Sequence, residues 1–168
     1  MSLRFARRVE RSPRSTRGTD RSPGFARRAG WACALLALAG CGGAVRMDPP
    51  SPEPPAAAAC RALAGRLPQV LDGAERTESD PPSPYVAVWG AGEIGLRCGV
   101  PRPANMAATD QVPVVDDVAW FADPARPALF TAIGRAAYVE VTISRAHAPE
   151  SVLVELAVPV KAALPQTG

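Results

Sequence analysis

Hydrophobic and polar residues alternate along the C-terminal two thirds of the chain with the periods of regular secondary structure. An apolar face at helical spacing predicts a helix over residues 57–67, and apolar residues at every second position predict strands over residues 94–100 and 137–143. A final helix is expected over residues 149–164, with a break at Pro159, because proline lacks the amide hydrogen that a helix interior requires. Shorter apolar runs predict further strands at residues 85–89, 112–115, 118–121 and 128–132.

Strands in the middle of a chain with a helix at each end indicate an α+β fold. We expect a mostly antiparallel sheet with the N- and C-terminal helices packed on one face. Asp116 and Asp117 are expected to form the turn of a hairpin within it. Residues 60–165 are enough for one hydrophobic core, so a single α+β domain is predicted there.

The first forty residues have a different pattern, in which a basic segment precedes a short apolar run. Nine arginines lie in residues 4–28, and the uncharged run over residues 31–40 is well short of the roughly 20 residues that span a membrane. This order is typical of a secretory signal, so we expect residues 1–40 to be removed during export. Phe-Ala-Arg-Arg occurs twice, at residues 5–8 and 25–28. A start site assigned too far upstream, or an internal duplication, would produce this repeat.

Leu38-Ala39-Gly40-Cys41 ends this run and resembles the lipobox of bacterial lipoproteins. The resemblance implies cleavage between Gly40 and Cys41 and a diacylglyceryl group on the Cys41 thiol. Two acyl chains give stable anchoring, whereas one gives only marginal binding. We therefore expect the chain to be held by lipid on Cys41 at the extracytoplasmic face of the cell membrane.

A proline-rich segment, residues 41–59, is expected to tether the domain to this anchor. Its five prolines favour an extended path at roughly 3 Å per residue, which would hold the domain up to about 50 Å from the lipid. Removal of the leader also reverses the charge. The whole chain has a net charge of +3, but residues 41–168 carry ten Arg and Lys against fourteen Asp and Glu, or about −4. An acidic exported domain gives no electrostatic reason to expect nucleic acid as a partner.

The four cysteines separate into two groups. Cys33 lies in the signal and Cys41 is expected to carry lipid. Cys60 and Cys98 remain as an even pair in an oxidising compartment, each on the apolar face of its element, so we expect a disulfide between the first helix and the sheet. A disulfide that closes the loop between Cys60 and Cys98 stabilises the fold by roughly 3–4 kcal/mol in the chain-entropy model. The single histidine, His147, has no accompanying ligand cluster, so no metal site is expected.

Gly90-Ala-Gly-Glu-Ile-Gly95 follows an apolar run with the spacing of a dinucleotide-binding fingerprint. That fingerprint requires a helix to begin at its second glycine, and Gly99, Pro101 and Pro103 prevent one. We expect these glycines to connect two strands of a hairpin, and no cofactor to bind.

Several segments, taken in order, resemble a known family. They are Cys60-Arg-Ala-Leu, Trp89-Gly90, Leu96-Arg97-Cys98-Gly99-Val100-Pro101-Arg102-Pro103, Val118-Ala-Trp120-Phe121 and Tyr138-Val139-Glu140-Val141. The family comprises actinobacterial lipoproteins built on domain of unknown function 3515. This chain departs from it at Ala91-Gly92-Glu93, where relatives tend to have Asp-Pro-Pro, and at Asp116-Asp117, where they tend to have Asn-Gly. The resemblance implies the location and the Cys60–Cys98 bond, and it implies no activity.

Candidate catalytic residues are few. The chain has no motif of a serine hydrolase, a zinc protease or a phosphate-binding loop. A serine triad would have to use His147, and a wall-acting hydrolase would need the carboxylates of Glu140, Asp123 and Glu155 to converge. We do not expect an enzyme.

Arg97 and Arg102 are the candidate ligand-binding residues, because guanidinium groups bind carboxylates and phosphates; the alternative is that they are ordinary surface arginines. The favoured hypothesis is a non-catalytic binding module whose partners are the membrane, through Cys41, and an envelope protein or wall component. A structural accessory subunit of an envelope complex would instead present an exposed apolar patch. An enzyme would present clustered acids with raised pKa values in a cleft.

Overall fold

The computed structural model describes residues 43–107, 109 and 111–167. The predicted signal peptide, its cleavage site after Gly40 and the lipidated Cys41 lie outside the described residues. The helices are α1 (Pro54–Ala64) and α2 (Pro149–Ala163). The strands are β1 (Val45–Arg46), β2 (Val70–Leu71), β3 (Ala74–Thr77), β4 (Ser79–Asp80), β5 (Val86–Trp89), β6 (Ile94–Val100), β7 (Val114–Val115), β8 (Val118–Ala122), β9 (Leu129–Ile133) and β10 (Tyr138–Ile143).

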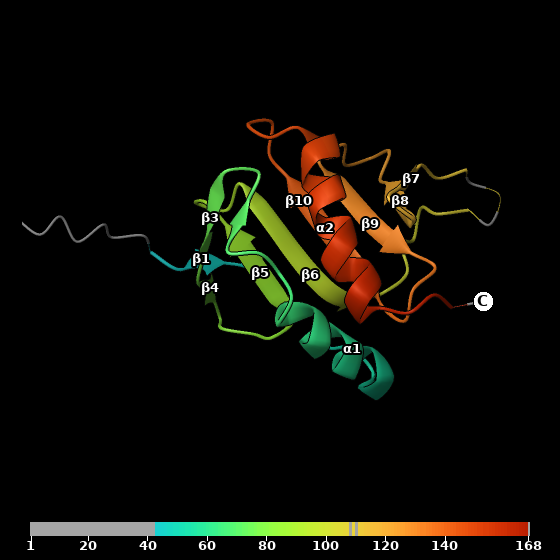
Figure 1. The fold of residues 1–168 in the computed structure, drawn as a ribbon, viewed down its shortest axis with the longest axis horizontal. Coiled ribbons are helices and arrows are strands. Elements are labelled where there is room, and N and C mark those ends of the chain that lie inside the picture. Colours follow the sequence, from blue (N-terminus) through green and yellow to red (C-terminus); the bar gives the residue numbers. More distant parts are fainter. Residues whose placement is uncertain (1–42, 108, 110, 168) are drawn as a thin grey trace, which may run out of the picture. The chain divides into compact units, whose positions relative to one another are not determined.

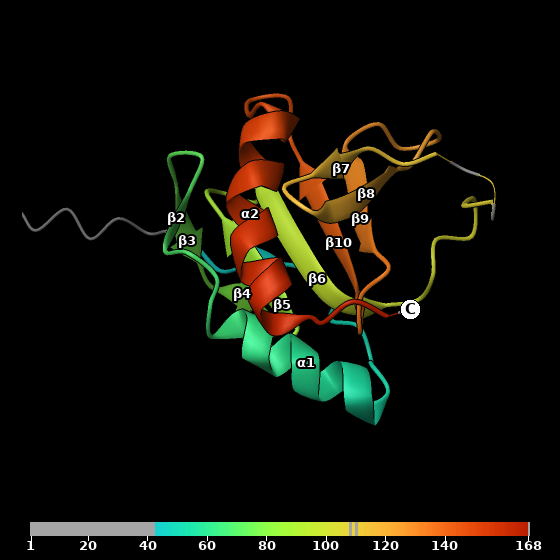
Figure 2. The same ribbon diagram turned by 45° about the vertical axis from the view of Figure 1, so that its right-hand side comes forward.

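Eight of the described strands form one sheet in the order β2-β3-β5-β6-β10-β9-β8-β7, and each pairing within it is antiparallel. The strands β1 and β4 form a separate parallel pair. Both helices lie against the same face of the large sheet (Figure 1, Figure 2). The predicted α+β fold is therefore confirmed. Among the helices in the described part of the chain, none is long and apolar enough to cross a membrane.

The helix-covered face of the sheet contains the hydrophobic core. In β6, Ile94, Leu96 and Cys98 are at most 1% exposed and belong to one cluster with Leu63 of α1 and Leu156 of α2. Their alternation in the sequence is what predicted this strand, and its bounds agree with the prediction. Val100 was expected on the same face, but it lies outside the core cluster, because the pairing of β6 with β10 shifts between Cys98 and Val100.

The predicted Cys60–Cys98 disulfide is present, with an S–S distance of 2.02 Å, and it joins α1 to β6. Cys60 is fully buried in α1, and Cys98 is 1% exposed in β6. The bond therefore ties the first helix directly to the centre of the sheet.

Two-residue turns connect two of the hairpins. Asp116 and Asp117, with φ of 46° and 62°, join β7 to β8 as the sequence predicted. Asp72 and Gly73, with φ of 46° and 80°, join β2 to β3, a hairpin that the sequence analysis missed. Positive φ at both central positions is what such turns require to match the twist of the strands.

The helix bounds differ from the prediction at the end of α1 and at two prolines. α1 ends at Ala64, three residues before the predicted end. α1 begins at Pro54, three residues earlier than expected, because proline is tolerated in the first turn, where its missing amide has no intrahelical partner. α2 continues through Pro159, so the predicted break is wrong. Buried Leu156, Ala157 and Val160 pack this part of α2 against the core and hold the helix together across the lost hydrogen bond.

Residues 45–53, here named the strap, cross the other face of the sheet. The Val45 amide donates to the Glu78 carbonyl at 2.9 Å, and the Met47 amide donates to the Asp80 carbonyl at 3.0 Å. The strap then leads directly into α1. The predicted tether of residues 41–59 is thus corrected, because everything from Val45 onward belongs to the folded domain.

Candidate functional site

The candidate site lies on the face of the sheet opposite the helices. Successive side chains of a strand point to opposite faces, so Gly95 and Arg97 of β6 face away from the core. The pairing shifts after Cys98, because Cys98 lies opposite Val139 and Val100 lies opposite Tyr138, so Gly99, with φ of 87°, is the extra residue of a β-bulge. The Met47 side chain occupies the space above Gly95, and the Pro52 ring occupies the space above Gly99. The strap therefore covers the two glycine positions and leaves Arg97 between them.

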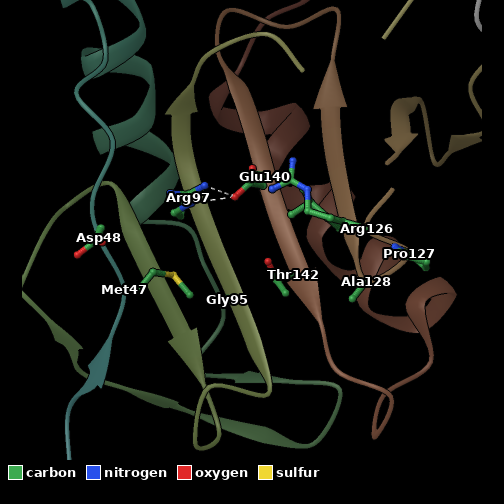
Figure 3. A pocket seen from close by; sticks show the side chains of 10 residues that line it. Met47, Asp48, Gly95, Arg97, Arg126, Pro127, Ala128, Glu140 and Thr142 are labelled. Carbon is green, nitrogen blue, oxygen red and sulfur yellow. Dashed lines mark hydrogen bonds and ion pairs between the residues drawn. The ribbon is translucent and has the colours of Figure 1, made fainter. Parts of the chain in front are cut away.

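An ion pair between Arg97 and Glu140 forms the centre of the site. The two residues are directly opposite in the β6–β10 pairing. Arg97 Nε donates to Glu140 Oε1 at 2.8 Å and Nη2 donates to the same oxygen at 2.5 Å. The Arg97 side chain is 34% exposed and that of Glu140 is 13% exposed, so one side of the guanidinium remains accessible. Figure 3 shows the pair spanning the neighbouring strands.

A second ion pair, between Arg126 and Asp123, lies in the loop between β8 and β9. Asp123 is buried and accepts hydrogen bonds from the Ala125 amide and from Arg126 Nε, both at 2.9 Å. It also accepts one from Asn105 Nδ2 at 3.4 Å. Burial by itself raises the pKa of this carboxyl, but the hydrogen bonds outweigh it and hold the pKa below its usual value.

Three cavities adjoin at Arg97. The Met47 cavity, of about 420 Å³, is lined by Met47, Arg126 and Glu140 among others. The Tyr138 cavity, of about 630 Å³, is lined by Tyr138, Arg102 and the end of the strap. The Asp123 cavity, of about 220 Å³, is lined by Asp123, Glu140 and three arginines. Of the described residues, Arg97 alone lines all three of these cavities.

The two arginines that the sequence singled out are therefore brought together. Arg97 and Arg102 both line the Tyr138 and Asp123 cavities. Arg102 is exposed and has no ion pair or side-chain hydrogen bond within the described part of the chain. With Arg126, the Asp123 cavity has three guanidinium groups against two carboxylates, an excess of one positive charge. An anion entering this cavity meets that excess.

Two of the three carboxylates considered for hydrolysis also meet here. Glu140 and Asp123 line the same cavity, whereas Glu155 lies on α2, where its carboxylate accepts a hydrogen bond from the Asp72 amide at 3.4 Å. Glu140 and Asp123 are each paired with an arginine, and the pKa of Asp123 is lowered. A general acid needs a raised pKa, so the lowered pKa of Asp123 does not suit it to that role.

His147 forms a different cluster that the sequence analysis did not anticipate. Its Nδ1 lies 2.9 Å from Asp72 Oδ2, its Nε2 lies 3.7 Å from Glu93 Oε2, and the side chain is 11% exposed. No hydroxyl of a described serine is hydrogen-bonded to the ring. His147 thus links the β2–β3 turn and the β5–β6 turn to the segment before α2.

Arg126 and the strap are the site components that sequence reasoning missed. Asp123-Pro124 is a turn signal, but nothing in it indicates that Arg126 reaches the same cavity as Arg97. The strap was assigned to a tether because of its prolines. Both contributions depend on contacts between segments far apart in the chain.

Comparison with known proteins gives one match. The sequence model of a family described as "Protein of unknown function (DUF3515)" matches residues 35–168. No curated protein and no solved structure matches the chain.

Proposed function

This chain belongs to the DUF3515 family of proteins of unknown function, and we propose that it is a lipid-anchored, non-catalytic binding module of the cell envelope. Its ligand is an anion held over the open face of the sheet. The observation that carries this proposal is the convergence of three cavities on Arg97, which shares them with Arg102 and Arg126.

The state of each arginine supports a binding role. Glu140 fixes the position of Arg97 before any ligand arrives, which lowers the entropy lost on binding. Arg102 has no competing ion pair in the described structure, so its full hydrogen-bonding capacity is available. Guanidinium groups suit this task because their planar fork of donors matches the oxygens of carboxylates and phosphates.

The proposed location rests on the leader and on the disulfide. The basic flank, short apolar run and lipobox-like Leu38-Ala39-Gly40-Cys41 support export and lipidation at Cys41. The Cys60–Cys98 bond supports an oxidising compartment. We place the domain at the extracytoplasmic face of the cell membrane, where an envelope protein or wall component is within its reach.

A structural accessory subunit is the second candidate, and one observation favours it. Val154 and Val158 are four residues apart on α2 and are 50% and 61% exposed. Neighbouring exposed valines on a helix provide an apolar contact for a protein partner. A hydrolase, the third candidate, would require Glu140 or Asp123 to leave its arginine.

Site-specific photocross-linking in cells distinguishes these candidates. A photoreactive phenylalanine derivative replaces Ala104, which is exposed and lines the Asp123 cavity, or Ala162, which is exposed on α2 and lines none of the three cavities. We expect an adduct from position 104 that disappears when Arg102→Glu is added, and none from position 162. A protein adduct from position 162 alone supports the accessory subunit. No adduct from position 104 overturns the proposed function.

A further inference from the structure

The strap brings the proposed anchor close to the site. The hydrogen bonds of Val45 and Met47 to the β4 region hold the chain on the domain from Val45 onward. Cys41 is four residues before Val45, and a fully extended chain spans at most about 14 Å over that distance. This limit replaces the reach of about 50 Å that a free tether of residues 41–59 would have.

The strap also lines two of the cavities that adjoin at Arg97. Met47 and Asp48 line the Met47 cavity, and residues 50–53 line the Tyr138 cavity. Figure 3 shows Met47 and Asp48 on the same face of the sheet as the Arg97–Glu140 pair. Met47 is six residues from Cys41, or at most about 21 Å of extended chain. A wall of the site therefore lies within that distance of the proposed lipid.

The donors of the Asp123 cavity suit a phosphate group. Arg97, Arg102 and Arg126 come from three segments: strand β6, the loop after it and the β8–β9 loop. The hydroxyl-bearing Thr131, 3% exposed, lines the same cavity. One guanidinium fork satisfies a planar carboxylate, whereas the tetrahedral oxygens of a phosphate accept hydrogen bonds from several directions. Arg102 is unpaired in the described structure, and Arg97 and Arg126, each bonded to one carboxylate, keep further N–H groups. Donors from three segments therefore favour phosphate.

We infer that the anion recognised at Arg97 is a phosphate group presented at the membrane surface, in the head group of a phosphorylated lipid. This inference rests on the proposed anchor and binding role, and it adds the ligand's chemistry and its source. A connection of at most about 21 Å between Cys41 and Met47 keeps the site near the bilayer, where lipid-borne phosphate is concentrated. A soluble phosphate has no such advantage.

The test uses mature protein purified from membranes and reconstituted into vesicles, with mass spectrometry of the residue at position 41. The vesicles contain phosphatidylcholine alone, phosphatidylcholine with phosphatidic acid, or phosphatidylcholine with oleic acid. Oleic acid is added in the same amount as phosphatidic acid and presents a carboxylate in place of the phosphate. Tryptophan fluorescence reports the thermal unfolding midpoint of the parent protein, Arg102→Glu and Arg145→Glu. Arg145 is a matched control, because it is exposed and lines none of the three cavities.

Phosphatidic acid is expected to raise the midpoint of the parent protein and of Arg145→Glu by several degrees, and not that of Arg102→Glu, because a ligand stabilises only the state that binds it. An equal rise with oleic acid overturns phosphate as the ligand. An equal rise with inorganic phosphate in phosphatidylcholine vesicles, with nothing added by phosphatidic acid, overturns the membrane source.

Two further results separate this inference from the proposed function. No shift with any probe, while the cross-link at position 104 persists, overturns the inference and leaves the binding role intact. If mass spectrometry finds no acyl group on Cys41 of the mature protein, the proposed anchor is absent and the inference is overturned as well. Loss of the position 104 cross-link is instead a failure of the proposed function itself.

Discussion

The two faces of strand β6 differ in almost every physical respect. Toward the helices, Ile94, Leu96 and Cys98 are almost fully buried and one of them is covalently bonded to α1. Toward the strap, two glycines flank a single charged residue, Arg97, which is one-third exposed. One face is closed by large apolar side chains, and the other is only partly covered.

This difference separates stability from recognition within seven consecutive residues. The helix side buries apolar surface and is expected to supply most of the free energy of unfolding. The strap side keeps the charge of Arg97 accessible and therefore buries less apolar surface. Substitutions on the helix side of β6 should therefore lower the free energy of unfolding, whereas substitutions on the strap side should weaken ligand binding.

Removal of the disulfide should have the largest effect on stability. The double variant Cys60→Ala, Cys98→Ala is expected to lose about 3–4 kcal/mol, because the unfolded chain gains the freedom of a loop that the bond had closed. Urea unfolding measures this loss. A reductant should lower the stability of the parent protein and leave that of the variant unchanged. Equal stabilities would show that the packing of α1 does not need the bond.

Shortening a buried side chain of α2 should cost slightly less. Leu156→Ala is expected to lose about 3 kcal/mol, because Leu156 is fully buried and leaves a cavity. The matched control, Val154→Ala on the exposed side of the same helix, should change the stability by less than about 0.5 kcal/mol. Both variants should keep the midpoint shift caused by phosphatidic acid, and its loss in folded Leu156→Ala would contradict the separation of the two faces.

The ion pair on the open face should have an intermediate effect. A double-mutant cycle with Arg97→Ala and Glu140→Ala is expected to give a coupling energy of about 1 kcal/mol. Breaking a fully buried ion pair costs about 3–5 kcal/mol. The coupling between Arg97 and Glu140 should be smaller, because Arg97 is one-third exposed and water screens its charge. A coupling near zero would mean that Glu140 does not position Arg97.

Asp123 should make stability depend on pH. Its folded-state pKa is lowered by hydrogen bonds, so it stabilises the fold above the unfolded pKa of about 4, and this contribution is lost as the pH falls through the folded pKa. Asp123→Asn should therefore be less stable than the parent protein at neutral pH, and the difference should shrink below about pH 4. Urea unfolding across a pH series measures it, with the exposed Asp48→Asn as control. A constant difference at every pH would contradict the prediction.

Arg102→Glu should have the smallest effect on stability and a complete effect on binding. Arg102 is exposed and unpaired in the described structure, so its replacement removes no native contact. Without ligand, its thermal midpoint should equal that of Arg145→Glu. A large loss of stability in Arg102→Glu would place Arg102 among the residues that hold the fold together.

Local patterns predicted the long elements better than the short ones. β6 was placed at its observed bounds because seven residues alternate in polarity with a period of two. β1, β2 and β4 have two residues each, which is too few to show any period, and they were missed. The predicted break at Pro159 was wrong, because the packing of neighbouring residues on the core overrode the local preference.

The candidate site was only partly predictable, for a similar reason. Arg97 and Arg102 were identified from guanidinium chemistry alone. That Arg126 lines the same cavity as Glu140 depends on how the β8–β9 loop folds onto β10, and no local pattern encodes this. The ring partners of His147 likewise come from turns 54 and 75 residues earlier in the chain.

By itself, the sequence determined the α+β class, the core faces of β10 and of β6 as far as Cys98, and the expected bond between Cys60 and Cys98, because these follow from backbone periodicity and from an even pair of cysteines within the predicted domain. Only the tertiary structure decided how much of the opposite face of the sheet stays accessible. That depends on Met47 meeting Gly95 and on Pro52 meeting Gly99, contacts across about fifty residues of chain. The strap thereby became part of the site, because the space above two glycines accommodates side chains from elsewhere and the space above Arg97 does not.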